Sequence, residues 1–334
     1  MRTGGTFLAL LGMLGSGVAR GTGPGEGFGE EMLMLSTARE AGSGGVAIED
    51  PWRQGTFLEA GSIMLSSGLR WIGIGAQGGA GPGFRLAADG FGFSASGIAG
   101  TRETPEGTWE GEMGNVDVSS WGARLLAQWT VRDDESWQVA VFGRASGLVQ
   151  RLHPVQNVGT GVEAGAQARR ITGGGSAMTM WVRAGPLGWG ASRMMAGRLT
   201  VGVGWLTQGK NGLLGGAEGF GIGGEGAVET SVLVQAGAGA TWWIGRLAGP
   251  GQTLFLRAGA RYAAGTAQTI QPRAGIGVLT RTSRELGFQL DYAIAPMGEL
   301  GFFHYVTLGF KLPSPSDLQL SAYHGGHAEP SADH

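Results

Sequence analysis

The sequence contains no cysteine among its 334 residues. This absence excludes disulfide bonds, thiol catalysis and zinc–thiolate sites, and it permits an oxidising compartment without implying one. Charged residues are also scarce, at 15% against the roughly 25% that is usual for soluble globular domains. The formal net charge is −2 and no basic run is present, so nucleic acid is not expected as a partner.

Long hydrophobic runs are missing after residue 19. No later stretch approaches the roughly 18 to 20 consecutive apolar residues that a membrane-spanning helix requires. Residues 1–19 are predicted to be a secretory signal peptide, with Arg2 at the positive start, an apolar stretch over residues 7–14 and small residues up to Ala19. We therefore expect an exported chain that is either soluble or crosses a membrane with β-strands.

Glycine is the residue in excess, with 68 of the 334 positions against an average of about 7%. Only 12 residues are proline and the glycines follow no three-residue repeat, so the chain is not collagen. The hydrophobic share of 42% and the 11 tryptophans exceed what a disordered glycine-rich chain carries. Each glycine costs a helix about 1 kcal/mol, whereas a curved barrel wall uses glycine at bends and on its inner face.

Apolar residues alternate with polar or small ones along much of the chain. Leu286, Phe288 and Leu290, for example, share one face of a predicted strand, and Gly287 and Gln289 share the other. The same period of two predicts strands at residues 57–66, 69–77, 90–98, 118–131, 137–149, 160–170, 177–184, 198–207, 230–243, 253–263, 270–281, 285–294 and 303–312. Bacterial barrels usually have an even number of strands, so we expect one more, within 33–50 or 80–90. The predicted fold is an all-β, transmembrane, antiparallel outer-membrane β-barrel of about 14 strands (range 12–16).

These patterns divide the chain into four parts. They are the signal peptide (1–19), an N-terminal periplasmic or lumenal segment that either stays apart from the wall or supplies its first strand (20–56), the barrel (57–312) and a polar tail that is predicted to be disordered (313–334). Residues 99–117 and 208–229 are predicted to be long loops, whereas 132–136 and 282–284 are predicted to be short periplasmic turns.

Several tryptophans fall near predicted strand ends. Aromatic girdles at the lipid interface and ordinary core packing both account for such positions. The residues concerned are Trp71, Trp121, Trp137, Trp181, Trp242 and Trp243.

No group of residues predicts catalysis. The sequence has no serine in a GxSxG elbow, and no paired carboxylates stand out. Gly73, Gly75 and Gly78 fit a dinucleotide fingerprint, but a chain this rich in glycine contains about two or three such matches by chance. The histidines of the tail are expected to be solvated rather than to bind a metal. We therefore predict no enzymatic activity, no cofactor and no metal site.

Four charged residues fall on the polar faces of the predicted strands near the C-terminus. They are Arg257, Arg261, Arg273 and Asp291, and we expect them to form a polar strip that faces the lumen. The alternative is ordinary pairing, in which inward arginines are neutralised by Glu163 or Asp291.

Two segments, one near each end of the chain, carry motifs of a known family. In residues 35–50 (LSTAREAGSGGVAIED), the pair Ala38 and Arg39 precedes a glycine-rich turn at Gly44 and Gly45, which resembles the opening of the PorV/PorQ family of outer-membrane proteins. Residues 290–301 (LDYAIAPMGELG) resemble its final hairpin through Asp291, Tyr292, Gly298, Glu299 and Gly301. The order of strands and loops between the two segments is also similar, so the resemblance covers roughly residues 33–312. Where the family usually has asparagine-proline-alanine after its opening motif, this chain has Leu58, Glu59 and Ala60.

The resemblance has implications for fold and function. The PorV/PorQ family is similar to FadL-type barrels, so it implies a closed barrel in the bacterial outer membrane with the N-terminal segment tucked into the lumen. It further implies a non-enzymatic partner in protein secretion or surface attachment, which contacts outer-membrane lipid and secretion-system proteins or exported substrates. Two alternatives stay open: a FadL-like passive transporter of hydrophobic small molecules, and a secreted soluble β-rich protein whose apolar faces meet each other.

Overall fold

The computed structural model describes residues 37–43, 46, 56–66, 69–81, 83–103, 109–152, 155–172, 176–190, 197–209, 218–229, 234–245, 252–263, 270–281, 286–296 and 302–312. The predicted signal peptide and tail lie outside the described residues, as do the motif residues Gly44, Gly45, Gly298, Glu299 and Gly301. Within the described part of the chain, no helix is both long enough and apolar enough to cross a membrane.

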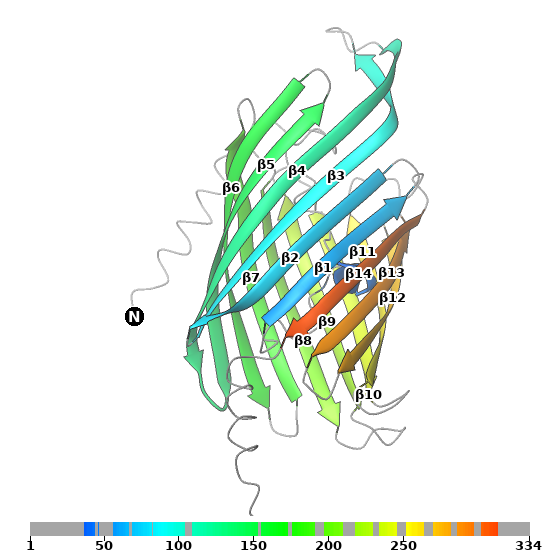
Figure 1. The fold of residues 1–334 in the computed structure, drawn as a ribbon. Helices are drawn as coiled ribbons and strands as arrows, with labels where there is room; N and C mark the ends of the chain where they lie inside the picture. Colours follow the sequence, from blue (N-terminus) through cyan, green and yellow to red (C-terminus); the bar gives the residue numbers. More distant parts are fainter. Residues whose placement is uncertain are drawn as a thin grey trace, which may run out of the picture.

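Fourteen antiparallel strands close into a barrel (Figure 1). In chain order they are β1 (Thr56–Ser66), β2 (Leu69–Gly81), β3 (Phe84–Glu103), β4 (Trp109–Asp133), β5 (Trp137–Leu152), β6 (Val155–Thr172), β7 (Ser176–Gly190), β8 (Arg198–Gly209), β9 (Glu218–Glu229), β10 (Val234–Gly245), β11 (Gln252–Ala263), β12 (Ile270–Arg281), β13 (Gly287–Pro296) and β14 (Phe302–Leu312). Each strand pairs with its neighbours in sequence, and β1 pairs with β14 to close the sheet. The prediction of an all-β barrel of about 14 strands is therefore confirmed.

The barrel wall is apolar outside and polar or small inside. Along β13, Phe288, Leu290 and Tyr292 are exposed, whereas Gln289 and Asp291 are buried. Large exposed apolar side chains occur on every strand from β2 to β14, among them Ile72, Leu86, Trp121, Val141, Val162, Met180, Val203, Ile222, Trp242, Leu256, Ile276, Leu290 and Phe310. A closed barrel satisfies its backbone hydrogen bonds between strands, so an apolar outer surface suits a lipid bilayer. The soluble alternative requires apolar faces that pack against each other, whereas these point outward.

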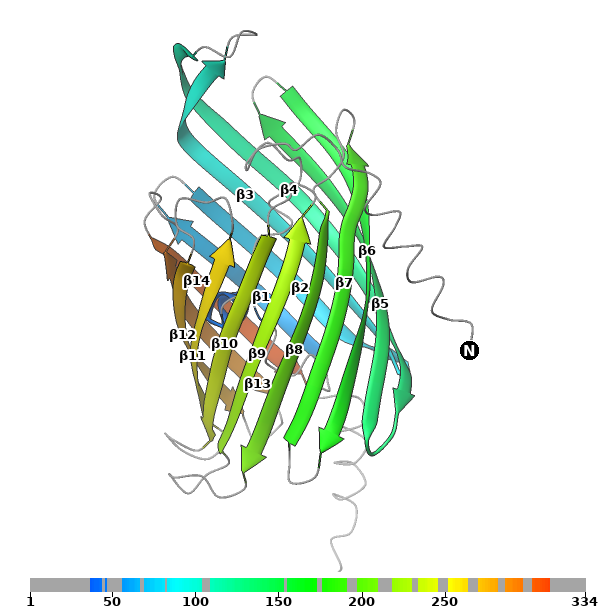
Figure 2. The same ribbon diagram turned by 180° about the vertical axis from the view of Figure 1, so that it is seen from behind.

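β3 and β4 are the longest strands, with 20 and 25 residues. They project beyond their neighbours at one end of the barrel (Figures 1 and 2). Their pairing continues as far as Glu103 and Trp109, with register shifts after Ala95, Ala99 and Thr101. The prediction of a loop over residues 99–117 is therefore wrong. Each register shift interrupts the strict alternation of side chains between the two faces. The sequence pattern of period two is therefore lost here, although the backbone pairing of β3 with β4 continues.

β9 occupies a segment that the sequence pattern predicted to be a loop. The fourteenth strand lies at 218–229, inside the predicted loop 208–229 and outside 33–50 and 80–90. Five of its positions are glycine: Gly219, Gly221, Gly223, Gly224 and Gly226. Its backbone nevertheless pairs with β8 and β10 along its whole length. Glycine has no side chain to alternate, which explains why the strand was missed.

The connection between β4 and β5 is as short as predicted, and hydrogen bonds to the carboxylate of Asp134 stabilise it. Asp134 accepts hydrogen bonds from the backbone N–H groups of Ser136 (2.9 Å) and Trp137 (2.7 Å), and from the side chain of Arg132. These bonds, with that of Arg132 as the largest cause, lower the pKa of Asp134 below its ordinary value. The turn is therefore most stable while Asp134 is ionised.

A short helix, α2 (Ala38–Gly42), lies inside the barrel against β11 to β14 (Figures 1 and 2). Thr37 caps its start, because its side-chain oxygen accepts a hydrogen bond from the backbone N–H of Glu40 at 3.2 Å. Ala38, Ala41 and Gly42 are the buried residues of the helix. A helix of five residues is unstable on its own, so contacts with the wall must hold it in place.

Candidate functional site in the barrel lumen

We call α2 together with Ser43 the plug. The backbone of the plug lies directly on the inner wall of the barrel at two glycines. A Cβ atom at Gly275 of β12 would lie 3.1 Å from the Cα atom of Gly42. At Gly239 of β10, a Cβ atom would overlap the carbonyl oxygen of Ser43. Side chains at these two positions would lift the plug off the wall, so glycine permits the close approach of the two backbones.

Asp291 of β13 joins the plug to the wall through two ion pairs. Its Oδ1 atom lies 2.9 Å from Nη1 of Arg257 on β11, and its Oδ2 atom lies 3.4 Å from Nε of Arg39 in the plug. The side chains of Asp291 and Arg257 are only 1% and 0% exposed. Gly277 leaves room for this pair, because a Cβ atom there would overlap Oδ1 of Asp291. Buried charges are tolerated when they are paired. Here Arg39 of the plug and Arg257 of the wall share the carboxylate of Asp291.

The start of the helix and its apolar face make further contacts with the wall. The backbone N–H of Ala38 donates a 2.9 Å hydrogen bond to Oγ1 of Thr307 on β14, which satisfies one donor that a helix start leaves open. Ala38 and Ala41 join a buried apolar cluster with Trp71 and Phe91, whose rings stack at a centroid distance of 6.4 Å. Trp71 therefore belongs to the packing inside the barrel and not to an outer girdle.

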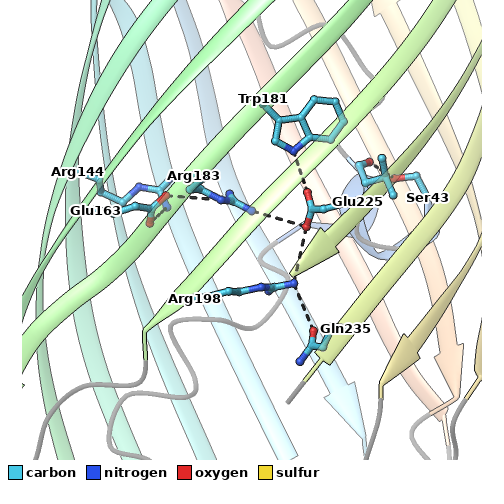
Figure 3. A network of polar contacts seen from close by, with 9 residues as sticks. Ser43, Arg144, Glu163, Trp181, Arg183, Arg198, Glu225 and Gln235 are labelled. Atoms are coloured by element: carbon cyan, nitrogen blue, oxygen red, sulfur yellow. Dashed lines mark hydrogen bonds and ion pairs between the residues drawn. The ribbon is translucent and has the colours of Figure 1, made fainter. Parts of the chain in front are cut away.

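A second group of charges lines the lumen on β5 to β10 (Figure 3). Glu163 of β6 lies 3.2 Å from Nη1 of Arg144 on β5 and 3.7 Å from Nε of Arg183 on β7. The register of β7 on β6 shifts opposite Glu163, where Gly185 adopts a φ of +132°. A Cβ atom at Gly185 would lie only 2.6 Å from the Cα atom of Glu163. The bulge at Gly185 thus brings the two strands close beside the carboxylate.

Glu225 of β9 continues this network (Figure 3). Its Oε1 atom lies 3.9 Å from Nη2 of Arg183 and 3.7 Å from Nη2 of Arg198 on β8, and its Oε2 atom accepts a 3.1 Å hydrogen bond from Nε1 of Trp181. Arg198 also donates to Oε1 of Gln235 on β10 at 3.3 Å. Arginines on β5, β7 and β8 therefore surround the carboxylates on β6 and β9, and their charges partly compensate each other. Trp181, like Trp71, faces the lumen.

An ion pair on β3 and β4 extends the polar lining. Arg124 contacts Asp89 through its Nε atom and lies 5.3 Å from the ring centroid of Phe91. Each of the lumen carboxylates whose side chains are described thus lies against at least one arginine. In the described part of the chain, no group of three or more histidines and acids is arranged to hold a metal ion.

The predicted polar strip lies on the lumen wall of β11 to β13. Arg257 and Asp291 are brought together as an ion pair. Arg273 is 6% exposed, and its Nη2 atom donates a 3.1 Å hydrogen bond to Oε1 of Gln271 rather than to Asp291. Arg261 is half-buried one strand away from Arg273. The strip is therefore one ion pair with two further arginines beside it.

The two segments that resemble the PorV/PorQ family contact each other. Ala38 and Arg39 of the first segment belong to the plug, and Asp291 of the second segment lies beneath it. Tyr292 points the other way: it is 37% exposed on the outer surface, where its hydroxyl group lies 2.7 Å from Nδ1 of His304. Only the inward residues of the second segment therefore take part in the lumen site.

Sequence reasoning missed most of the network in Figure 3. Arg144, Arg183 and Arg198 lie on predicted strands, and their inward positions follow from the period of two, so the signal was present. Glu225 fell in a segment predicted to be a loop, which hid the partner of two of these arginines. Glu163 was named only as a partner for other arginines, and Trp181 only as a tryptophan near a predicted strand end.

The closed wall, the apolar outer surface and the N-terminal helix inside the lumen define a membrane-spanning β-barrel with an internal plug. Comparison with protein-family models gave no match, and comparison with curated proteins gave none either. Solved structures with a similar fold include CdiB from Acinetobacter baumannii (10% identity, TM-score 0.47, 78% of this chain and 60% of that chain). They also include the TodX deltaS2S3 mutant monoaromatic hydrocarbon channel (9%, 0.45, 85% and 97%) and a bacterial polysaccharide outer membrane secretin (9%, 0.44, 79% and 100%). The likeness is distant, and this chain spans only 60% of the length of CdiB.

Proposed function

We propose that this chain is a PorV/PorQ-like barrel of the bacterial outer membrane that acts without catalysis as a partner in protein secretion or surface attachment. The observation that carries the proposal is the ion pair between Arg39 and Asp291. It joins the two segments on which the family resemblance rests, although they lie at opposite ends of the barrel sequence. The resemblance thus concerns one structural unit, the plug and the part of the wall that it contacts at Asp291, and not two unrelated stretches.

The interior of the barrel supports a role in protein contacts. The plug lies on glycines of the inner wall, and Arg144, Arg198 and Arg257 of the lumen are each paired with a carboxylate on another strand. Such an interior stabilises a fixed wall, which suits a protein that presents its rims and loops to partners in the membrane. The exposed apolar side chains of the outer surface supply the contact with lipid.

The first test is fractionation of the native host, followed by gel mobility with and without boiling. We expect a heat-modifiable band in the outer-membrane fraction, because folded barrels resist detergent until they are heated. Cross-linking and affinity capture of the tagged barrel should then recover exported proteins or secretion components. A different outer-membrane barrel with the same tag is the control. Repeated recovery of the barrel alone would count against a secretion partner and leave the membrane location untouched.

A second candidate is a FadL-like passive transporter of hydrophobic small molecules. The aromatic cluster inside the barrel favours it, since Trp71, Phe91, Phe303 and Tyr305 are all buried on the lumen side. In this case the plug would be the gate. Deletion of the gene should then lower uptake of a hydrophobic solute while leaving secretion unchanged, whereas the first proposal expects the reverse.

A further inference from the structure

Arg273 differs from the paired arginines of the lumen. The side chain is 6% exposed, and its hydrogen bond goes to the neutral amide of Gln271 at 3.1 Å. Its Nε and Nη1 atoms have no hydrogen-bond partner, and Arg273 takes part in none of the ion pairs formed by the described residues. Arg124, Arg144, Arg183, Arg198 and Arg257 each lie within 4.0 Å of a carboxylate. A buried guanidinium without a counter-charge is costly, so the position needs an explanation.

The surroundings of Arg273 add donors and positive charge. Tyr305 of β14 interacts electrostatically with both Arg273 and Arg261. Across the lumen wall, arginines outnumber carboxylates among the residues whose side chains are described: Arg124, Arg144, Arg183, Arg198, Arg257, Arg261 and Arg273 against Asp89, Glu163, Glu225 and Asp291. The local field therefore favours an anion beside Arg273.

The wall next to Arg273 has glycine on one side and an apolar cluster on the other. Arg273 pairs with Gly259 on β11, and Gly259 pairs with Gly239 on β10, so the wall itself supplies no side chain in that direction, and the plug backbone at Ser43 lies on Gly239. Phe303, which is 1% exposed and packs edge-on to Tyr305 at a centroid distance of 6.4 Å, lies in the apolar cluster of the lumen.

We propose that Arg273, with Arg261, Tyr305 and Gln271, forms a binding site for an oxyanion, a carboxylate or phosphate group carried by a small solute. The unused N–H groups of Arg273 donate to the anion, the Tyr305 hydroxyl supplies a further donor and Arg261 adds charge. This site goes beyond the proposed function and does not depend on it.

The test measures thermal unfolding of the full chain in detergent micelles during titration with inorganic phosphate, acetate or chloride at constant ionic strength. Phosphate or acetate should raise Tm saturably, by about 2 to 5 °C, because a ligand that binds only the folded state stabilises it. Chloride should have no such effect. The arm that responds distinguishes a phosphate site from a carboxylate site.

Two variants make the test specific. Arg273→Gln should abolish the anion response and, without anion, should unfold at a higher temperature than the wild type, since it removes an uncompensated buried charge. Arg144→Gln, the matched control, removes a lumen arginine that is paired with Glu163 at 3.2 Å; it should lower Tm and keep the anion response. Arg273→Lys keeps the charge and should retain a weaker response. Equal responses of wild type and Arg273→Gln, or a wild-type response to chloride as large as that to the oxyanions, would overturn the proposal.

Discussion

Arg39 and Asp291 form a 3.4 Å ion pair that ties the N-terminal plug to the penultimate strand of the barrel. Asp291 also lies 2.9 Å from Arg257, whose side chain is fully buried, whereas that of Arg39 is 17% exposed. If the plug detaches from the wall, Asp291 keeps Arg257 as its partner and the side chain of Arg39 becomes solvated. The Asp291–Arg257 pair therefore stays intact with the plug in or out, and movement of the plug leaves neither of these two charges unpaired.

This asymmetry predicts that the loss of Asp291 destabilises the barrel more than the loss of its partner Arg39. Asp291→Asn removes the carboxylate from a fully buried arginine and should destabilise the barrel by about 3–5 kcal/mol. Arg39→Gln removes a partly exposed partner and should cost about 1 kcal/mol or less. Urea unfolding in detergent micelles, followed by circular dichroism, measures both. Equal costs would show that the plug contributes as much to the charge balance as the wall does.

The absence of cysteine allows the position of the plug to be tested by an engineered disulfide. The backbone N–H of Ala38 lies 2.9 Å from Oγ1 of Thr307, so cysteines at these two positions should form a bond under mild oxidation. The product should migrate faster than its reduced form on a denaturing gel. Ala38→Cys with Thr200→Cys, on β8 across the barrel, is the control and should not cross-link. A bond in both variants would mean that the plug is not fixed against β14.

Displacing the plug should change conduction through the barrel. A valine at Gly239 would overlap the carbonyl oxygen of Ser43, so Gly239→Val should force the plug off the wall. In planar bilayers we expect a larger single-channel conductance than for the wild type. Gly226→Ala on β9 is the control, because a Cβ atom there meets nothing within 4 Å. Unchanged conductance in Gly239→Val would mean that the plug does not obstruct the path.

The sequence predicted the wall well because alternation is a local property. In β13, Phe288 and Leu290 face out while Gln289 and Asp291 face in, as the period of two requires. β9 was missed because the alternation of Phe220 and Ile222 with glycine is short and is interrupted where Gly223 and Gly224 follow each other. Its pairing with β8 and β10 is a long-range property that the segment itself does not display.

The lumen site was predictable only in part, for a similar reason. Arg257 and Asp291 were expected to face inward, and their pairing follows from adjacent strands in register with each other. The plug could not be derived from periodicity, because a helix of five residues carries no helical repeat. The family resemblance suggested a lumenal segment, but only the fold brings Arg39 to Asp291.

Glu225 allows the electrostatics of the lumen to be tested once the plug is displaced. Arginines outnumber the described carboxylates on the wall, so Gly239→Val should conduct anions better than cations across a potassium chloride gradient. Adding Glu225→Gln removes the carboxylate that lies 3.9 Å and 3.7 Å from Arg183 and Arg198, and should shift the reversal potential further toward anions. The matched control adds Trp181→Phe instead, which removes the 3.1 Å hydrogen bond to Glu225 without changing the charge and should leave the reversal potential in place. A shift of the same size in both double variants would trace the effect to altered packing around Glu225 and not to its charge.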